Sequence, residues 1–174
     1  MLQWCKSILV GLGALITCAI YSLSASGASA DEGTNDEFRQ LAILIAAPHN
    51  GETAMHEDLS AMYQSLRQRG FSSKEILSLE GELNRQQLMC TLQEAHRRIT
   101  DWRNGAVFFF YSGHGTYYPQ TALTVEEARP ALCLDKSCEV NASQARASSV
   151  VYWDEVFSTL AVPQHIRLIL VPDC

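Results

Sequence analysis

The sequence predicts an α/β domain with an open, mainly parallel sheet of about four strands flanked by helices. The first observation is a series of short, mostly apolar runs: 41–47, 75–79, 106–111 and 166–171. The second is that segments with the helical spacing of apolar residues stand between these runs. Continuous apolar runs are typical of strands buried on both faces. Their alternation with helices is typical of a parallel sheet covered on its faces.

The first helix pattern follows the first apolar run. Its four apolar residues have the i, i+3, i+4, i+7 spacing of one helix face: Leu59, Met62, Tyr63 and Leu66. Gly70 stands where this helix is expected to end, because glycine readily takes the left-handed conformation of a helix C-terminus.

The second helix pattern has a recognisable start. Asn84, with Gln87 three residues later, has the spacing of a capping box, in which each side chain accepts a backbone hydrogen bond of the other residue. The buried stripe of this helix is then expected to consist of four apolar residues: Leu88, Leu92, Ala95 and Ile99.

The segment 112–149 shows no helical or strand pattern and is predicted to be irregular. It is too long for an ordinary connection, which indicates a functional segment. A third helix pattern follows it, with four apolar or aromatic residues at helical spacing: Trp153, Val156, Phe157 and Leu160.

The first thirty residues have the features of an export signal. Lys6 is their only charged residue, residues 8–20 are almost unbroken in apolar and small side chains, and residues 28–30 read Ala-Ser-Ala. A charged start, a short apolar middle and a small-residue cleavage site predict a cleaved signal peptide, and therefore a periplasmic or secreted protein. An uncleaved membrane anchor is the alternative, and Cys18 gives a weaker lipoprotein reading.

The predicted organisation is therefore a signal peptide over 1–30, a flexible leader over 31–40 and one domain over 41–174. Thirteen basic against nineteen acidic side chains give a net charge of −6, which argues against a nucleic-acid partner. No stable membrane insertion is expected once the signal is removed.

Two of the predicted strands end in residues that can carry chemistry. The third strand runs into Ser112, Gly113, His114 and Gly115, and the fourth runs into Asp173 and Cys174. Active sites of parallel sheets lie at the carboxyl ends of the strands. The two glycines are expected to let the chain turn sharply and to expose His114.

The remaining histidines are expected to be surface or loop residues: His49, His56, His96 and His165.

A cysteine at a neighbouring strand end could lie within reach of His114. An unperturbed thiol has a pKa of about 8.5, so an adjacent imidazole is needed to make Cys174 a thiolate that attacks a carbonyl. The same imidazole can protonate the leaving amine, and the backbone N–H of Gly115 can stabilise the oxyanion. A Gly-His-Gly sequence and one later cysteine also occur by chance, so the residues alone leave both interpretations open.

Cys133 and Cys138 can form a small disulfide loop in an oxidising compartment, or remain two unlinked thiols. Their spacing fits no zinc pattern, because no second pair of ligands is nearby. The sequence therefore indicates no metal and no cofactor.

Six segments together resemble the caspase-like cysteine peptidases, and specifically the metacaspase and bacterial caspase-like group. The most specific is FFFYSGHG (108–115), which is similar to the histidine motif of that family. The others follow in the family's order: LAILIAAP (41–48), HEDLSAMYQSL (56–66), ALCLD (131–135), VVYWDEVFSTL (150–160) and IRLILVPDC (166–174).

The resemblance implies a caspase-like sheet and a cysteine-type endopeptidase that acts on peptide or protein substrates through His114 and Cys174. Metacaspases cut after Arg or Lys, and Asp58 and Asp173 match the acidic residues that bind the basic side chain. A carboxylate pairs well with a guanidinium, which agrees with this specificity. Caspases that cut after Asp carry an Arg in the loop that matches residues 48–58, and this loop contains none, so the resemblance argues against specificity for acidic residues. The alternative for Asp58 is a charge at a helix N-terminus.

The sequence departs from the family's pattern in three ways. In one alignment the nucleophile is Cys174, and in the other it is a residue 175. Family members continue beyond this point, so the sheet is expected to be incomplete at its C-terminal edge and this chain to be inactive or very weakly active alone. Arg129 and Pro130 stand where acidic residues are usual, so calcium binding is not expected. A catalytically inactive interaction module or a truncated relic is the alternative function.

Overall fold

The computed structural model describes residues 37–49, 51–118, 129–138 and 149–174. The predicted export signal and most of the predicted leader lie outside these residues. Within the described ranges, no helix is both long enough and apolar enough to cross a membrane. The first strand begins at Arg39, so the last two residues of the predicted leader belong to the sheet.

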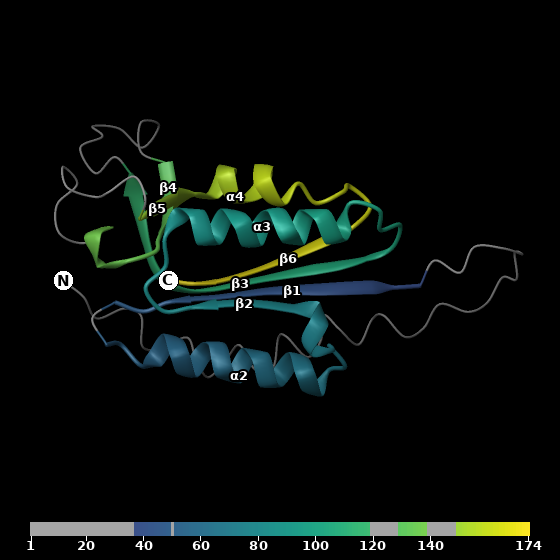
Figure 1. The fold of residues 1–174 in the computed structure, drawn as a ribbon, viewed down its shortest axis with the longest axis horizontal. Coiled ribbons are helices and arrows are strands. Elements are labelled where there is room, and N and C mark those ends of the chain that lie inside the picture. Colours follow the sequence, from purple (N-terminus) through teal and green to yellow (C-terminus); the bar gives the residue numbers. More distant parts are fainter. Residues whose placement is uncertain (1–36, 50, 119–128, 139–148) are drawn as a thin grey trace, which may run out of the picture. The chain divides into compact units, whose positions relative to one another are not determined.

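The described residues form a six-stranded sheet in which four strands are parallel. The parallel strands lie in the order β2–β1–β3–β6, as Figure 1 shows, and match the four predicted runs to within a few residues, except that β3 is longer. Their bounds are Arg39–Ala47 for β1, Ile76–Glu80 for β2, Gly105–Tyr118 for β3 and Arg167–Asp173 for β6. The predicted α/β fold with a mainly parallel open sheet is confirmed.

Two further strands, β4 (Arg129–Cys133) and β5 (Val150–Tyr152), extend the sheet in the antiparallel sense. β4 pairs with the last residues of β3, with His114 opposite Cys133. The prediction of an irregular segment over 112–149 is therefore wrong in part. Residues 112–118 lack a continuous apolar pattern, and tertiary pairing makes them a strand: residues 112 and 113 pair with β1, and residues 114–118 pair with β4.

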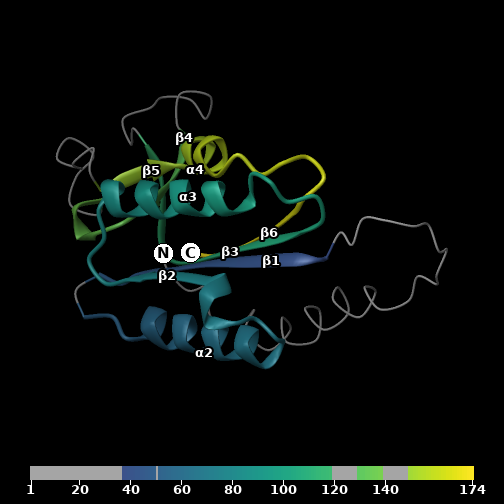
Figure 2. The same ribbon diagram turned by 45° about the vertical axis from the view of Figure 1, so that its right-hand side comes forward.

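Among the described residues, three α-helices cover the two faces of the sheet: α2 (Ala54–Gln68), α3 (Arg85–Ile99) and α4 (Trp153–Leu160). α2 lies on one face, and α3 and α4 lie together on the other (Figures 1 and 2). Alternate residues of β1 divide between the two cores: Ile43 packs in the cluster with α3 and α4, and Leu44 packs in the cluster with α2. This burial on both faces explains the continuous apolar run of β1.

The sequence signals of α3 are confirmed. The Gln87 backbone N–H donates to Asn84 Oδ1 at 3.0 Å, and the Asn84 N–H donates to Gln87 Oε1 at 2.8 Å. All four residues of the predicted stripe are fully buried: Leu88, Leu92, Ala95 and Ile99. In α4, Val156 and Leu160 are buried as expected, but Phe157 is 41% exposed and stacks on Trp153.

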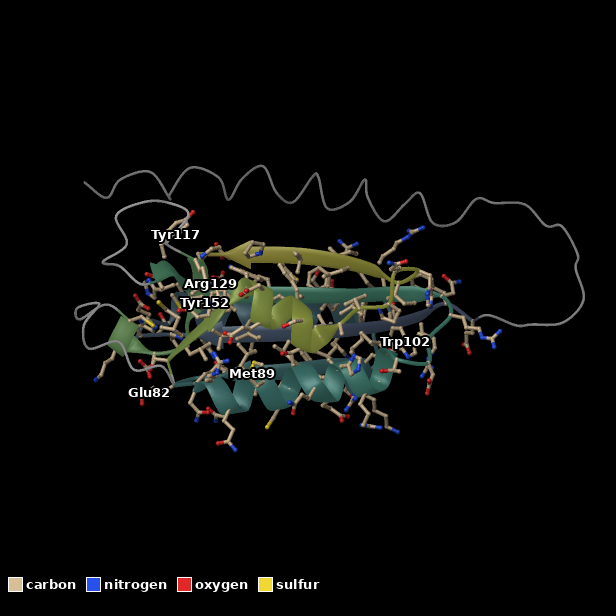
Figure 3. The ribbon with its side chains drawn as sticks, turned by 90° about the horizontal axis from the view of Figure 1, so that it is seen from above. Glu82, Met89, Trp102, Tyr117, Arg129 and Tyr152 are labelled. Carbon is tan, nitrogen blue, oxygen red and sulfur yellow. The ribbon has the colours of Figure 1, made fainter. Side chains whose placement is uncertain are left out.

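Short connections complete the fold. The 3-10 turn η1 (Ser73–Glu75) leads into β2, and the 3-10 turn η2 (Lys136–Cys138) follows β4. In Figure 3, Tyr117, Arg129 and Tyr152 lie at the opposite end of the sheet from Trp102. Tyr117 and Arg129 lie in the paired ends of β3 and β4, and His114 lies in the same paired segment. These labels therefore mark the end of the sheet at which His114 lies.

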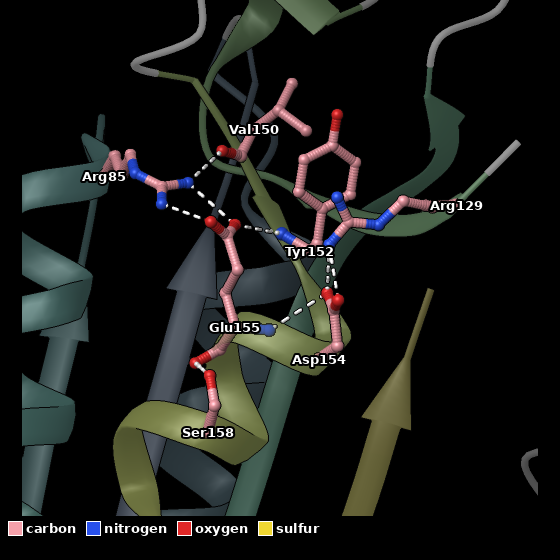
Figure 4. A network of polar contacts seen from close by, with 7 residues as sticks. All are labelled: Arg85, Arg129, Val150, Tyr152, Asp154, Glu155 and Ser158. Carbon is pink, nitrogen blue, oxygen red and sulfur yellow. Dashed lines mark hydrogen bonds and ion pairs between the residues drawn. The ribbon is translucent and has the colours of Figure 1, made fainter.

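A polar network joins β4, α3 and α4 at this end (Figure 4). The Arg85 guanidinium of α3 donates to Glu155 Oε2 of α4 at 2.8 Å. Arg129 of β4 donates to Asp154 Oδ1 at 2.6 Å and lies 3.8 Å from the centroid of the Tyr152 ring. These contacts fix β4, and through it the strand segment that carries His114.

Candidate active site

The pairing of β3 with β6 brings the two predicted chemical segments together. Ser112 of β3 is the partner of Asp173 of β6, so Cys174 follows directly beside the His114 segment. A Cβ atom placed on Gly115 would lie 3.2 Å from Cys174 Sγ. The Cys174 thiol therefore packs against the backbone of the residue that follows His114.

The Ser-Gly-His-Gly segment does not turn, and this corrects the prediction. Residues 112–115 are extended and continue β3, and neither Gly113 nor Gly115 has a positive φ angle. Glycine is required at Gly113 for space, since a Cβ there would lie 2.5 Å from the Tyr111 hydroxyl oxygen. Glycine at position 113 therefore reflects close packing against the Tyr111 side chain and not a sharp turn of the chain.

Tyr111 fixes the backbone of the strand segment that carries His114. Its buried hydroxyl lies 2.6 Å from the carbonyl oxygen of Cys133 and 2.9 Å from that of His114, and the two oxygens share its single proton. Burial raises the pKa of Tyr111 far above its usual range, so the hydroxyl remains a neutral donor. The hydroxyl thereby ties β3 to β4 at the position of His114.

The His114 ring is half-buried between two residues that precede α2. Its Nε2 atom lies 3.1 Å from Glu52 Oε2 and 3.3 Å from Glu52 Oε1. The His49 ring stacks on it, with 4.4 Å between the ring centroids and 29° between the planes.

His49 lies in the loop after β1, as predicted, but it is not at the surface, because only 2% of the residue is accessible to solvent. The prediction holds for His56 and His165, which are exposed. His96 is half-buried, and its Nδ1 atom lies 3.2 Å from the carbonyl oxygen of Leu160. His49 differs from the other three histidines because its ring stacks on His114 of β3. The spacing of residues in the sequence gives no sign of this contact.

Glu52 is held in place by its own turn. Its backbone N–H donates to the carbonyl oxygen of His49 at 3.1 Å, and the His49 N–H donates back to Glu52 Oε2 at 3.0 Å. The hydrogen bond from the His49 N–H, followed by that from His114, lowers the pKa of Glu52 below its usual value. The carboxyl group is therefore ionised at neutral pH, and sequence reasoning missed it because nothing in its local pattern marks it.

Asp58 and Asp173 both lie next to Ser112. The Ser112 hydroxyl donates to Asp58 Oδ2 at 3.2 Å, and Asp173 is the strand partner of Ser112. Burial, and then the charge of Asp58, raise the pKa of Asp173. Within α2, the acidic residue of the first turn is Glu57, which weakens the helix-terminus explanation for Asp58.

Cys133 and Cys138 are buried thiols and are not joined by a disulfide. The Cys138 thiol donates to the Ser149 carbonyl oxygen at 3.2 Å, and its hydrogen bond with Cys133 lowers its pKa. In the described part of the chain, no three His, Cys, Asp or Glu side chains come together in a way that could hold a metal ion.

A comparison with protein families identifies the domain. The family model described as "Caspase domain" matches residues 39–166, and the chain belongs to this family. No curated protein matches the chain. The match spans Asp58 and His114 and ends just before β6. Membership confirms the resemblance and the caspase-like α/β fold, and it supports a cysteine peptidase in general, which acts on peptide or protein substrates.

Proposed function

We propose that this protein is a cysteine-type endopeptidase in which His114 and Cys174 form the catalytic dyad. Two features support the proposal. The family is one of cysteine peptidases, and the Cys174 thiol packs beside Gly115, one residue from His114. The second feature carries the assignment of Cys174, because a nucleophile must lie close to its base.

The proposed reaction has two halves. The Cys174 thiol gives its proton to the His114 ring, and the thiolate attacks the scissile carbonyl carbon. The oxyanion that forms accepts a hydrogen bond from the Gly115 N–H. His114 then returns the proton to the leaving amine as the C–N bond breaks, and water hydrolyses the thioester and restores the thiol.

We further propose that the residue before the cut is Arg or Lys. The support is the acidic pair of Asp58 and Asp173, which both lie next to Ser112. Two neighbouring carboxylates raise each other's pKa, and a guanidinium or ammonium group relieves this repulsion while it gains charged hydrogen bonds. An acidic side chain at the same place would add a third negative charge.

Fluorogenic peptides that differ only in the residue before the leaving group test both proposals. We expect cleavage after Arg and Lys and none after Asp, and a fall in kcat of about 10³-fold or more in His114→Ala. Asp58→Asn should raise KM for the Arg peptide about tenfold or more, because a charged hydrogen bond is lost. Glu57→Gln, one residue away on the same helix, is the matched control and should change neither constant.

Preferred cleavage after Asp would contradict the specificity, and turnover that survives His114→Ala would contradict the dyad.

We also propose export, on the basis of residues 1–30. Fractionation of cells that express the full coding sequence tests it, and a full-length product retained in the cytoplasm would contradict it.

A further inference from the structure

We propose that Glu52 is a positioning residue whose carboxylate orients the His114 ring and stabilises its charged form. The inference rests on the proposed function, because it assigns a partner to the catalytic histidine. It goes beyond that function by making the site a triad of Cys174, His114 and Glu52.

The geometry assigns the two ring nitrogens of His114 different tasks. Both Glu52 carboxylate oxygens face Nε2, at 3.1 and 3.3 Å. An ionised carboxylate only accepts hydrogen bonds, so Nε2 carries a proton. In the neutral ring this leaves Nδ1 as the atom that takes the proton of the Cys174 thiol. The imidazolium that forms then donates from Nε2 to Glu52.

Glu52 is itself fixed by short-range structure. The reciprocal bonds between His49 and Glu52 close a turn directly after β1, and Gly51 takes the left-handed conformation in it at φ +80°. The buried His49 ring of the same turn stacks on the His114 ring. This turn therefore contacts the His114 ring in two places: Glu52 binds its Nε2 atom, and His49 packs on its face.

The expected effect is moderate because the pair is partly solvated. The exposed fractions of the His114 and Glu52 side chains are 37% and 41%. Ion pairs this exposed have only a small effect, and a fully buried carboxylate partner of a catalytic histidine has a far larger one. Loss of the Glu52 charge should therefore slow formation of the thiolate about two- to fivefold.

Glu52→Gln tests the charge with the shape retained, since the amide oxygen can still accept from the His49 N–H. The measurement is the second-order rate of alkylation of the full chain by iodoacetamide at pH 7, resolved by peptide mass. The exposed Cys90 serves as an internal reference. We expect the rate at Cys174, relative to Cys90, to fall about two- to fivefold in Glu52→Gln, and less in Glu52→Asp. Glu57→Gln is the control and should leave the ratio unchanged.

His114→Ala separates this inference from the proposed function. A fall at Cys174 in His114→Ala without a fall in Glu52→Gln would overturn the role of Glu52 and leave the dyad intact. No fall in His114→Ala would overturn both.

A second measurement does not depend on the thiol. An NMR titration of the Glu52 carboxyl carbon should give a pKa below the usual value, and His114→Ala should raise it part of the way back. The rise is partial because the His49 N–H, which contributes most to the lowering, remains in place. An unchanged Glu52 pKa in His114→Ala would contradict the contact.

Discussion

Replacing Gly113 by alanine tests whether close packing against the buried Tyr111 ring holds the strand segment that carries His114. A Cβ on Gly113 would lie 2.5 Å from the Tyr111 hydroxyl oxygen and 2.6 Å from its Cζ atom. The Tyr111 ring is fully buried, so it has little room to move away. The ring must shift or β3 must bend, and either movement strains the hydroxyl bonds to His114 and Cys133.

The magnitude follows from three terms. Overpacking a buried site costs about 1–3 kcal/mol, and weakening a buried hydrogen bond costs about 1 kcal/mol. Alanine in an extended strand recovers about 0.5–1 kcal/mol relative to glycine. The free energy of unfolding of Gly113→Ala should therefore fall by about 1–3.5 kcal/mol. At roughly 3–4 °C per kcal/mol for a domain of this size, Tm should fall by about 3–14 °C.

Thermal and urea unfolding monitored by circular dichroism measure this change. Gly115→Ala is the matched control, because the nearest atom to its new Cβ is the Cys174 Sγ at 3.2 Å, which rotation of an exposed side chain can move. Its Tm should stay within about 2 °C of the wild type. A Gly113→Ala protein with the stability of the control would refute the packing explanation of the motif.

Further predictions concern the core, the polar network and the acidic pair. Leu92→Ala should lower the free energy of unfolding by about 2–5 kcal/mol, because the side chain is fully buried between α3 and the sheet; urea unfolding checks this. Glu155→Gln should lower Tm by a few degrees, by loss of the part-buried pair with α3, and Asp154→Asn, a more exposed residue of the same turn, should lower it less. Affinity for an arginine ester should be present at neutral pH and lost as the pH falls through the raised pKa of Asp173. Asp58→Asn should move the midpoint of this loss of affinity to lower pH, because the charge of Asp58 contributes to the raised pKa of Asp173. Inhibition by the ester, measured across a pH series, checks this, and an unchanged midpoint would contradict it.

Most of the sheet and its helices could be predicted because each has a local pattern. The apolar run of β1 follows from burial on both faces, and the Asn84–Gln87 capping box and the stripe of α3 follow from helix geometry. The extension of β3 through 112–118 could not be predicted, since its partner β4 lies more than ten residues further along the chain.

The residues of the candidate site likewise fall into those that the sequence could predict and those that it could not. His114, Cys174 and the acidic pair follow from strand ends and from the family resemblance. Glu52 and His49 do not, because their roles arise from one turn that folds back on a strand about sixty residues later. The glycine motif was found for its chemistry, yet its physical reason is the space required by Tyr111.

The most direct test of the central claim, that His114 activates Cys174, is covalent labelling by a peptidyl chloromethyl ketone that carries arginine. Alkylation by such a reagent requires an activated thiolate beside an occupied substrate site. Peptide mapping should show modification of Cys174 well in excess of the exposed Cys90, and His114→Ala should abolish the excess. Equal labelling of the two cysteines, or labelling of Cys174 that persists without His114, would contradict the account.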